Sequence, residues 1–458
     1  MRNPLRSIFL YLMQLSALLI FVTGCRDNDG DSDVNPIEAI FISSNENTLP
    51  VGEEFVFTVL NNLDEDITSI SKIYIGNTLI EGNVFSPEEP GEYSVVAQYK
   101  HNDELYTSNT IQVNVAPKAT IVNLFDRITH YTRKATDVLP VPENILKISN
   151  TTHARKITND MIAQLHGKLR LNVTVWAACD NYDRKGHIQL VFVPTGEDYV
   201  DNENKIEIEI ARFITPFMNR NISPDHVDYS FEIDNVLKLL KDTSLKEKYD
   251  FYISMDLNGL TSTGQKQVPG CEGRKETFIA SIDFVSPKSE YEHTAQTFHL
   301  LAKKFGIKSY KDSNTDVLGE AVKTFSINTE KDIQNAKLYF ITSSHGANQG
   351  GEEYNRREHF LSFDGSSVAS FIPGGVSCEP FRVVNTQGNG IYGPSPRTDE
   401  EWASFSNWCP GDIIPIREFD LGTVSAGNHV LKIEIPSAQF VDNQGSISVS
   451  AYIQGETE

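Results

Sequence analysis

The segment CDNYDRKGH, residues 179–187, places several groups that could do chemistry in one short turn. Asp180 and Asp183 lie three residues apart, Tyr182 lies between them, and Arg184 follows directly. Two carboxylates beside an arginine could donate and accept protons in a hydrolytic site. The same residues could equally form a charged surface loop, because short acidic loops are common in acidic proteins. The segment by itself does not decide between the two.

A second group of ionisable residues occurs in SHGANQGGEEYNRREH, residues 344–359. Glu352 and Glu353 lie in a glycine-rich turn between His345 and His359. Glutamate and histidine are common general acids and bases, so this turn is a second candidate for a site. An ordinary hydrogen-bonded loop histidine is an equally good interpretation of His345.

The third candidate is a long loop, NTQGNGIYGPSPRTDEEWASFSNWCPG, residues 385–411, which carries Trp402 and Trp408. A long loop inside a compact β domain is more often functional than connecting. An indole beside polar groups suits the apolar face of a sugar ring, although an indole that only packs the loop is just as ordinary.

Several of these residues also have an ordinary structural interpretation. We expect Asp180 to accept hydrogen bonds within its turn, and Glu352 and Arg356 to be solvated. We expect Tyr182 and Tyr354 to pack their loops, with stacking on a sugar as the alternative.

The elements that must position these groups belong to an acidic chain of 458 residues with a formal net charge of −22. The length allows about two to four domains. The charge argues against nucleic acid and against an anionic membrane surface as partners, since both favour basic patches. It fits a protein that handles neutral or basic substrates.

The beginning of the chain has the pattern of a bacterial lipoprotein. Residues 1–24 combine a basic start, a short apolar run and small residues before Cys25, as in a secretory signal peptide. We expect Cys25 to be lipidated, and the acidic residues 25–36 to form a flexible tether. The protein is then expected to be exported and anchored to the outer membrane by its lipid alone. Acidic residues after the cysteine also resemble the surface-export signal of Bacteroidetes lipoproteins.

Alternating apolar residues and frequent turns predict an all-β chain. Residues 37–116 predict a small immunoglobulin-like β-sandwich, which we interpret as a spacer, with a glycan- or protein-contacting module as the alternative. Residues 118–288 and 292–458 predict two further β-sandwiches. One short helix is expected after Asp234, an N-cap residue, and residues 294–306 could be helical or extended.

Several separate motifs resemble the peptide:N-glycosidase F family. They are CDNYDR (179–184), RFITPF (212–217) after an alternating strand, FEIDNVLKLL (231–240), and WCPG (408–411). A glycine-rich turn with a glutamate and an aromatic residue precedes the last of these, in the order that the family shows. The resemblance covers residues 118–458.

The resemblance implies two antiparallel jelly rolls side by side, with the site in the cleft between them. The family hydrolyses the amide that joins the innermost N-acetylglucosamine to asparagine, so that asparagine becomes aspartate and the glycan leaves as a glycosylamine. It uses no metal and no cofactor. The implied partners are N-linked glycoproteins or glycopeptides, and a monomer is expected.

The family's functional residues map onto both candidate turns. Asp183 matches the primary catalytic aspartate, expected to contact the scissile linkage, and Glu353 matches the glutamate of the second domain, expected to position the water. Asp256, in FYISMDLNG, is the closest candidate for a third catalytic carboxylate. Arg184 matches a sugar-contacting arginine. The expected substrate-binding residues are Arg184, Asp180, His345, Tyr354 and Trp408.

The cysteines favour two disulfides. Apart from Cys25, four of the 5 cysteines remain, an even number in a chain expected to be exported. None has CxxC spacing, so a zinc site is not expected. Cys378 and Cys409 match a disulfide of the family. Cys179 lacks its near partner and could instead pair with Cys271.

The chain also departs from the family. An arginine usually lies a few residues before WCPG, where this chain has SFSN, and Arg397 or Arg417 could substitute for it. The loss favours a rival function, a non-catalytic glycan-binding lipoprotein on the same fold. A copper monooxygenase with paired jelly rolls is a weaker rival, because it needs clustered histidines and a methionine, and only His345 and His359 lie close in sequence.

Overall fold

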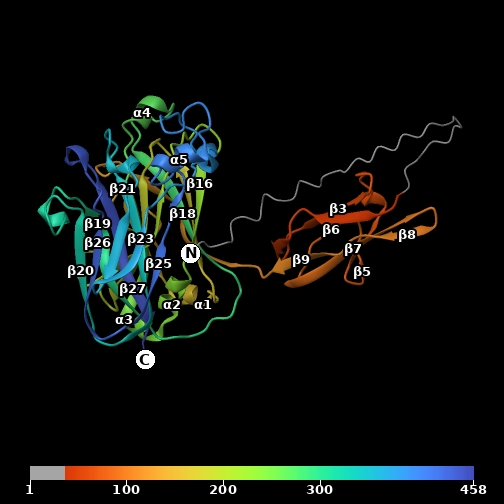
Figure 1. Cartoon of the computed structure of the whole chain (residues 1–458), viewed down its shortest axis with the longest axis horizontal. Coiled ribbons are helices and arrows are strands. Elements are labelled where there is room, and N and C mark those ends of the chain that lie inside the picture. The colour runs from red at the N-terminus through yellow and green to blue at the C-terminus, as the bar shows by residue number, and fades with distance from the viewer. Residues whose placement is uncertain (1–36, 458) are drawn as a thin grey trace. The chain divides into compact units, whose positions relative to one another are not determined.

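The computed structural model describes residues 37–457, which divide near residue 115 into two units, each described by itself (Figure 1). The predicted signal peptide 1–24, the lipidated Cys25 and the tether 25–36 lie outside the described residues. No helix among the described residues is long and apolar enough to cross a membrane.

The first unit is a β-sandwich of two sheets. One sheet has the order β1 (Ile40–Ser44), β3 (Phe55–Asn61), β6 (Val84–Phe85). The other has the order β2 (Thr48–Pro50), β9 (Ile111–Ala116), β7 (Gly91–His101), β4 (Lys72–Ile75), β5 (Thr78–Leu79), with β8 (Glu104–Thr107) beside β7. Alternate side chains of β3, among them Phe55, Phe57 and Val59, are fully buried, as the period-two pattern requires.

The first half of the second unit is a jelly roll built from a four-stranded and a six-stranded sheet. The smaller sheet has the order β10 (Thr120–Tyr131), β18 (Glu276–Ser286), β13 (Arg170–Ala177), β16 (His226–Glu232). The larger has the order β11 (Leu146–Lys147), β12 (Thr152–Ile157), β17 (Tyr249–Leu257), β14 (Lys185–Pro194), β15 (Ile206–Ile214), β24 (Ile413–Ile414). The last strand comes from the far end of the chain and pairs with the RFITPF segment.

Four short helices belong to this first roll: α1 (Asn159–Ala163), α2 (Asp234–Lys241), α3 (Thr243–Lys248) and α4 (Gly264–Gln267). The helix expected after Asp234 is α2. The carboxylate of Asp234 accepts a hydrogen bond from the Leu169 amide (2.7 Å) instead of capping its own helix. The apolar side of α2 closes the end of the core through Val236, Leu237, Leu239 and Leu240.

The second roll pairs two four-stranded sheets. One has the order β19 (Gln296–Ile307), β27 (Ser446–Glu456), β21 (Ile333–His345), β25 (Arg417–Val424). The other has the order β20 (Val322–Thr329), β26 (Gly427–Glu434), β22 (His359–Phe363), β23 (Ser366–Phe371). Residues 294–306, which the sequence left open, therefore belong almost entirely to a strand. A long excursion between β23 and β24 contains α5 (Asp399–Phe405).

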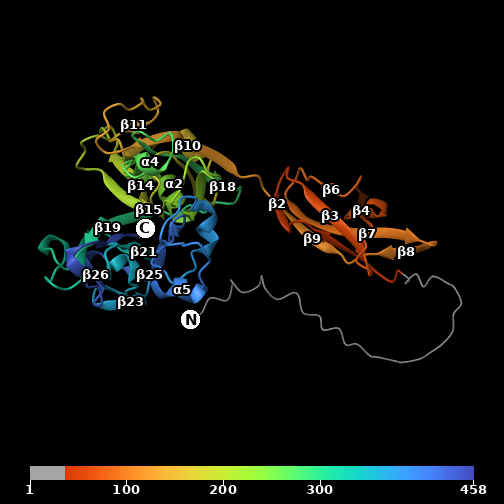
Figure 2. The same cartoon turned by 90° about the horizontal axis from the view of Figure 1, so that it is seen from above.

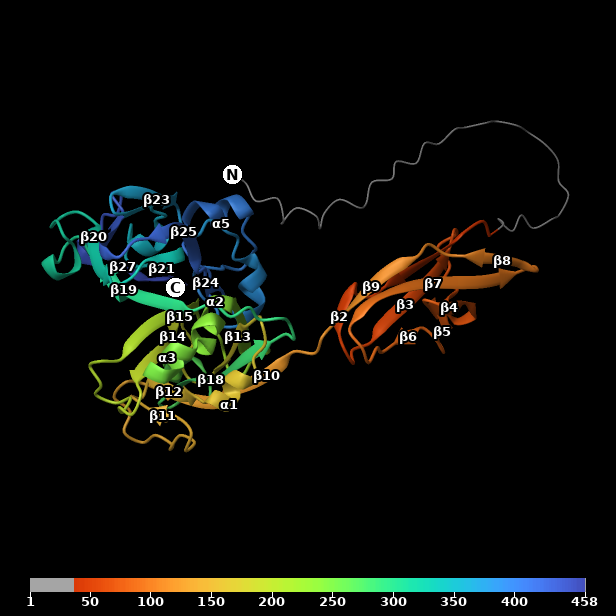
Figure 3. The same cartoon turned by 90° about the horizontal axis from the view of Figure 1, so that it is seen from below.

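The two rolls lie side by side, with β15 of the first against β19 and β27 of the second (Figures 2 and 3). Along β15, Ile208 and Ile210 point into the first core, so the intervening Glu209 points toward the second roll and is 2% exposed. The all-β prediction, an immunoglobulin-like sandwich followed by two jelly rolls, is confirmed.

Candidate active site

A cavity of about 920 Å³ is lined by residues of both rolls. The first roll contributes the loop between β13 and β14, the start of β14 and the end of β17. The second contributes the end of β21, the short helix η3 (Glu352–Tyr354) and the excursion before β24. The charged, histidine and aromatic lining residues include Tyr182, Asp183, Arg184, Lys185, His187, Asp256, His345, Glu353, Tyr354, Arg397, Phe405 and Trp408.

Asp183 and Glu353 are 170 residues apart in sequence, yet both line this one cavity. The charge of Glu353 affects the pKa of Asp183. Burial and the nearby charge of Glu353 raise the pKa of Asp183 to about 7, against the opposing charge of Arg184. Burial also raises the pKa of Glu353. A carboxyl with a pKa near 7 is suited to give and take protons at neutral pH.

The turn that carries Asp183 is built around a buried ion pair. Arg184 binds Asp180 through two hydrogen bonds, Nε to Oδ2 at 2.6 Å and Nη2 to Oδ1 at 3.2 Å. Asp180 is 1% exposed and accepts two further bonds, from the amides of Leu260 (2.7 Å) and Tyr182 (3.1 Å). Asp180 therefore does not line the cavity, and it acts on the site by fixing Arg184, which does.

Two further features fix the position of the turn that carries Asp183. Cys179 is joined to Cys271, which ties the loop before Asp183 to the loop after β17. Gly259 packs so closely that a Cβ atom would lie 2.8 Å from the Asp180 carboxylate and 2.6 Å from Thr277 Cβ. The other predicted pair, Cys378 and Cys409, is also joined.

The turn that carries Glu353 has an ion pair of the same kind. Glu352 is fully buried, and Arg357 binds it through Nε to Oε2 at 2.8 Å and Nη2 to Oε1 at 3.1 Å. The expectation that Glu352 is solvated was wrong, because its side chain also accepts bonds from the amides of Gln439 and Phe440.

Arg356 was also expected to be solvated, and this was wrong as well. Its side chain is half-buried and donates to the carbonyls of Pro373 (3.1 Å) and Ala403 (2.7 Å), which anchors the excursion before β24 to the glutamate turn. A charged residue in a glycine-rich turn is ordinarily expected to be exposed, and only the excursion folding over the turn reverses this.

Glu353 itself is held more directly than Asp183. Its Oε2 accepts a hydrogen bond from the Gly346 amide (3.1 Å), and the Tyr354 hydroxyl also bonds to its carboxylate. Asn407 fixes the backbone of the turn, since its amide donates to the carbonyls of Glu352, Glu353 and Asn355 at 2.9, 2.8 and 3.1 Å.

Asp256 lines the cavity but differs from the other two carboxylates. Its side chain pairs with Lys304 Nζ at 3.0 Å and accepts from Thr152 Oγ1 at 3.3 Å. Burial alone would raise the pKa of Asp256, but the charge and hydrogen bond of Lys304, together with His187 and Thr152, outweigh burial, and the pKa is lowered. Asp256 therefore stays ionised at neutral pH and can shape the field of the cavity, whereas proton donation falls to Asp183 or Glu353.

The predicted aromatic and histidine residues also reach the cavity. Burial lowers the pKa of His345 well below its ordinary value, so the ring is neutral, and its Nε2 bonds Ser343 Oγ at 2.8 Å. Trp408 lies 5.8 Å from that ring and donates its indole N–H to the Ser344 carbonyl at 2.8 Å. Tyr354 is 36% exposed and borders the opening.

Of the two arginines suggested as substitutes for the missing one, Arg397 lines the cavity and Arg417 does not. The Arg397 guanidinium lies 5.5 Å from the Trp402 ring and 5.6 Å from the Phe405 ring, and its Nε donates to the Ile391 carbonyl. Trp402 is fully buried, so it supports the loop and does not face a ligand.

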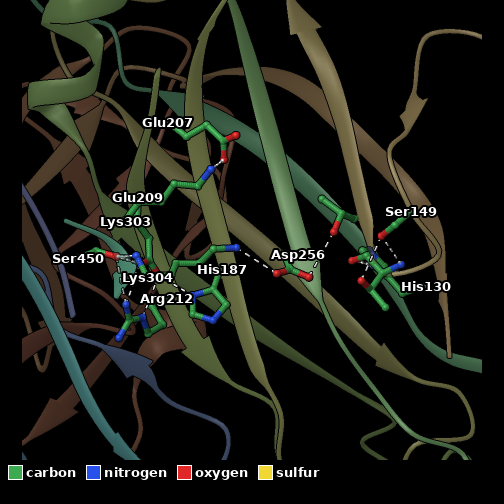
Figure 4. A network of polar contacts seen from close by, with 12 residues as sticks. His130, Ser149, His187, Glu207, Glu209, Arg212, Asp256, Lys303, Lys304 and Ser450 are labelled. Atoms are coloured by element: carbon green, nitrogen blue, oxygen red, sulfur yellow. Dashed lines mark hydrogen bonds and ion pairs between the residues drawn. The ribbon is translucent and has the colours of Figure 1, made fainter. Parts of the chain in front are cut away.

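The sequence did not reveal a polar network at the junction of the rolls (Figure 4). Glu209 binds Arg212 (Oε2 to Nη2, 2.7 Å) and His187 (Oε1 to Nδ1, 2.7 Å). Arg212 is fully buried and crosses to the second roll, where it donates to Ser343 Oγ (2.9 Å) and the Ser448 carbonyl (2.8 Å). The strict alternation of KIEIEIARF was the available signal. When one face of β15 packs in the core, the polar residues of its other face must contact either solvent or another part of the protein.

This network reaches both halves of the cavity. His187 lines the cavity directly, and Ser343 connects Arg212 to His345. Burial alone would raise the pKa of Glu209, but Arg212 and His187 hold it lowered, so the junction contains a fixed charge pair. Lys185 is a further cavity residue that the sequence did not single out.

Two family models match the chain, the N-terminal domain of peptide-N-glycosidase F over residues 120–266 and its C-terminal domain over residues 313–454. Two structures of PNGF-II align with TM-scores of 0.54 and 0.56 at 14% and 15% identity, over 89% of this chain and 89% and 90% of theirs. A crystal structure of peptide-N(4)-(N-acetyl-beta-D-glucosaminyl) asparagine amidase aligns with a TM-score of 0.50 at 13% identity, over 74% of this chain and 96% of that one. These structures show a shared fold. No curated protein matches this chain in sequence at a significant level.

Proposed function

Because the chain belongs to the peptide-N-glycosidase F family, we propose that it hydrolyses the amide between asparagine and the innermost N-acetylglucosamine of N-linked glycoproteins or glycopeptides. The observation that carries the proposal is the convergence of Asp183 and Glu353, from different rolls, on one cavity, where both carboxyls are half-buried and both have a raised pKa.

The two carboxyl groups divide the proton transfers of the reaction. Water adds to the amide carbonyl carbon while Glu353, held by the Gly346 amide, orients the water and accepts its proton. The C–N bond then breaks as the protonated form of Asp183 gives its proton to the leaving nitrogen. One water is consumed, and the products are an aspartic acid side chain and a glycosylamine. A proton passing from Glu353 to Asp183 restores the starting state.

The aromatic lining supports a sugar as the bound group. Tyr182, Tyr354, Phe405 and Trp408 line the cavity together with Arg184, whose guanidinium is already oriented by Asp180. Aromatic faces and a fixed guanidinium suit the apolar and hydroxyl sides of a sugar ring. A pocket of this kind binds through the glycan core, which is common to different N-glycoproteins.

A denatured N-glycoprotein incubated with the purified protein tests the proposal. We expect loss of the glycan and conversion of asparagine to aspartate in the peptide mass spectrum. Asp183→Asn should abolish the conversion, whereas Asp201→Asn, an exposed carboxylate in the same roll, should leave it intact. Glycan release that leaves a sugar on the asparagine would contradict the assignment.

A non-catalytic glycan-binding protein is the second candidate, and one observation favours it. The stretch before WCPG contains no arginine, and the cavity has Phe405 in that stretch instead. Retention of an intact glycopeptide, with no change in its mass after long incubation, would support binding without hydrolysis.

The localisation proposed from the sequence is independent of the activity. We infer that the chain is exported and anchored by a lipid on Cys25, from the signal pattern of residues 1–24. Metabolic labelling with a fatty-acid analogue should mark the wild-type chain and not Cys25→Ala. Equal labelling of both would contradict the anchor.

A further inference from the structure

Lys185 is the first residue of β14 and directly follows Asp183 and Arg184. Its backbone pairs with Ile214, which fixes its position at the end of the larger sheet that meets the cavity. Because side chains alternate along a strand, Lys185 and His187 share one face, and both line the cavity. The side chain of Lys185 is half-buried.

Two other cations at the site are bound to carboxylates, and Arg133, which also lines the cavity, is exposed. Arg184 is committed to Asp180, and Lys304 to Asp256. Within the described part of the chain, the Lys185 ammonium has neither a hydrogen-bond nor an ion-pair partner. The charges of Glu353 and Glu209 nevertheless affect its pKa. A desolvated ammonium without a partner weakens a fold. Stability therefore gives no reason for a lysine at this place.

We propose that Lys185 is the cation that binds the carbonyl oxygen of the scissile amide and stabilises the oxyanion that forms there. The inference rests on the proposed hydrolysis and adds a residue to it. When the water oxygen bonds to the carbonyl carbon, the π electron pair moves to the carbonyl oxygen. The Lys185 ammonium donates a hydrogen bond to this anionic oxygen until the pair returns and the C–N bond breaks.

The surroundings of Lys185 fit this role. It follows Asp183, the carboxyl that protonates nitrogen, by two residues, and the charge of Glu353, the carboxyl that takes the proton of water, acts on it from the second roll. A charged donor in a site that excludes water is effective at holding an oxyanion, because water does not compete for it. The chain also lacks the arginine before WCPG, and among the described residues that line the cavity Lys185 is a half-buried cation without a bonded partner.

The titration of Lys185 gives the proposal a distinct signature. Burial and the charge of Arg212 lower its pKa to about 8, against the opposing charges of Glu209 and Glu353. The charged and titratable groups around it are Asp183 and Arg184 on its loop, His187 on β14, Glu209 and Arg212 on β15, Asp256 on β17, Lys304 on β19, His345 on β21 and Glu353 in η3. Loss of the Asp183 proton already lowers activity as the pH rises through about 7, and loss of the Lys185 proton should make this decline steeper above about pH 8.

The test compares Lys185→Met and Lys185→Arg with the wild type on a defined N-glycopeptide, measuring kcat, KM and melting temperature across pH. Lys185→Met should lower kcat by about 100-fold or more, the size found for single oxyanion donors, with a smaller change in KM. Its melting temperature should not fall, because the removed charge had no partner. Lys337→Met, which removes an exposed lysine paired with Glu418, is the matched control and should leave kcat unchanged.

Lys185→Arg separates an electrostatic role from a structural one. It should recover much of the lost kcat, and its activity should decline less steeply above about pH 8 than that of the wild type, because a guanidinium stays charged and only the Asp183 proton is then lost. Normal kcat in Lys185→Met, or an alkaline decline that is equally steep in Lys185→Arg and in the wild type, overturns the inference while wild-type hydrolysis keeps the proposed function. A wild type that binds the glycopeptide without cleaving it overturns both.

Discussion

The aspartate turn, residues 179–185, and the glutamate turn, residues 345–357, use the same device on different frameworks. In each, a buried carboxylate bound by two hydrogen bonds to an arginine lies next to the reactive carboxyl, as Asp180 and Arg184 do in one and Glu352 and Arg357 in the other. The shared ion pair fixes the backbone from which the reactive side chain projects.

The frameworks differ in how the reactive group itself is held. The aspartate turn is tied at its base by the Cys179–Cys271 disulfide, and no side chain of the described residues is seen to bond the Asp183 carboxylate. The glutamate turn has no disulfide, and Glu353 is bound by Gly346 and Tyr354. The comparison indicates different roles for the two carboxyls. Asp183 is free to transfer a proton to the substrate, whereas Glu353 is held in place and orients water.

Substitution of the two reactive carboxyls is expected to give the largest effect. Asp183→Asn should lower kcat/KM by about 10³-fold or more, and Glu353→Gln by about 10²-fold, because loss of a positioned acid or base removes about 10²–10⁴-fold. Steady-state kinetics on one glycopeptide measures both. Equal losses would remove the distinction between a proton-transferring and a water-orienting carboxyl.

Removal of each arginine tests the shared ion pair. Arg184→Met and Arg357→Met should each lower the free energy of unfolding by about 3–5 kcal/mol, because each leaves a buried carboxylate unpaired. Denaturant unfolding measures this. Only Arg184 lines the cavity, so Arg184→Met should also raise KM, whereas properly folded Arg357→Met should act mainly through stability. A stable Arg357→Met would show that the second pair is dispensable.

Single hydrogen-bonding residues behind the turns should have intermediate effects. Asn407→Ala removes a donor from three carbonyls of the glutamate turn, and we expect a loss of about 1–3 kcal/mol in unfolding free energy. Thr215→Val is the counterpart in the aspartate turn, where the hydroxyl accepts from the Arg184 amide and donates to the Tyr182 carbonyl, and it should cost about 1 kcal/mol. If Thr215→Val lowers the free energy of unfolding more than Asn407→Ala does, the Cys179–Cys271 disulfide stabilises the aspartate turn less than the comparison implies.

The last expected effect is a pH dependence of stability at Asp183. Its pKa is about 7 in the folded protein, whereas the ordinary pKa of an exposed aspartate is 3.8. Between these values the unfolded state loses this proton while the folded state keeps it, so the contribution destabilises the fold as pH rises. Asp183→Asn should therefore melt a few degrees above the wild type at about pH 8, and the gap should shrink toward about pH 4. A gap that does not depend on pH would contradict the raised pKa.

The sequence predicted the strands well where one face of a sheet meets an apolar core. Ile208 and Ile210 are buried as their alternation requires. It could not assign Glu209 and Arg212, because a polar face is expected to be solvent-exposed until another domain covers it. The same limit explains the errors at Glu352 and Arg356, which the excursion before β24 and the loop around Phe440 cover.

The amino-acid sequence by itself determined the all-β class, the family motifs and the types of the reactive residues, because strand alternation and short motifs are local properties of the chain. Only the tertiary structure decided which charges are paired and which are free. Asp183 and Lys185 lie two residues apart and Asp180 a few residues before them, yet folding buries Asp180 behind Arg184 and leaves the other two facing Glu353. Charge pairing depends on distance and desolvation, and both are set by the junction of two rolls that local sequence does not encode.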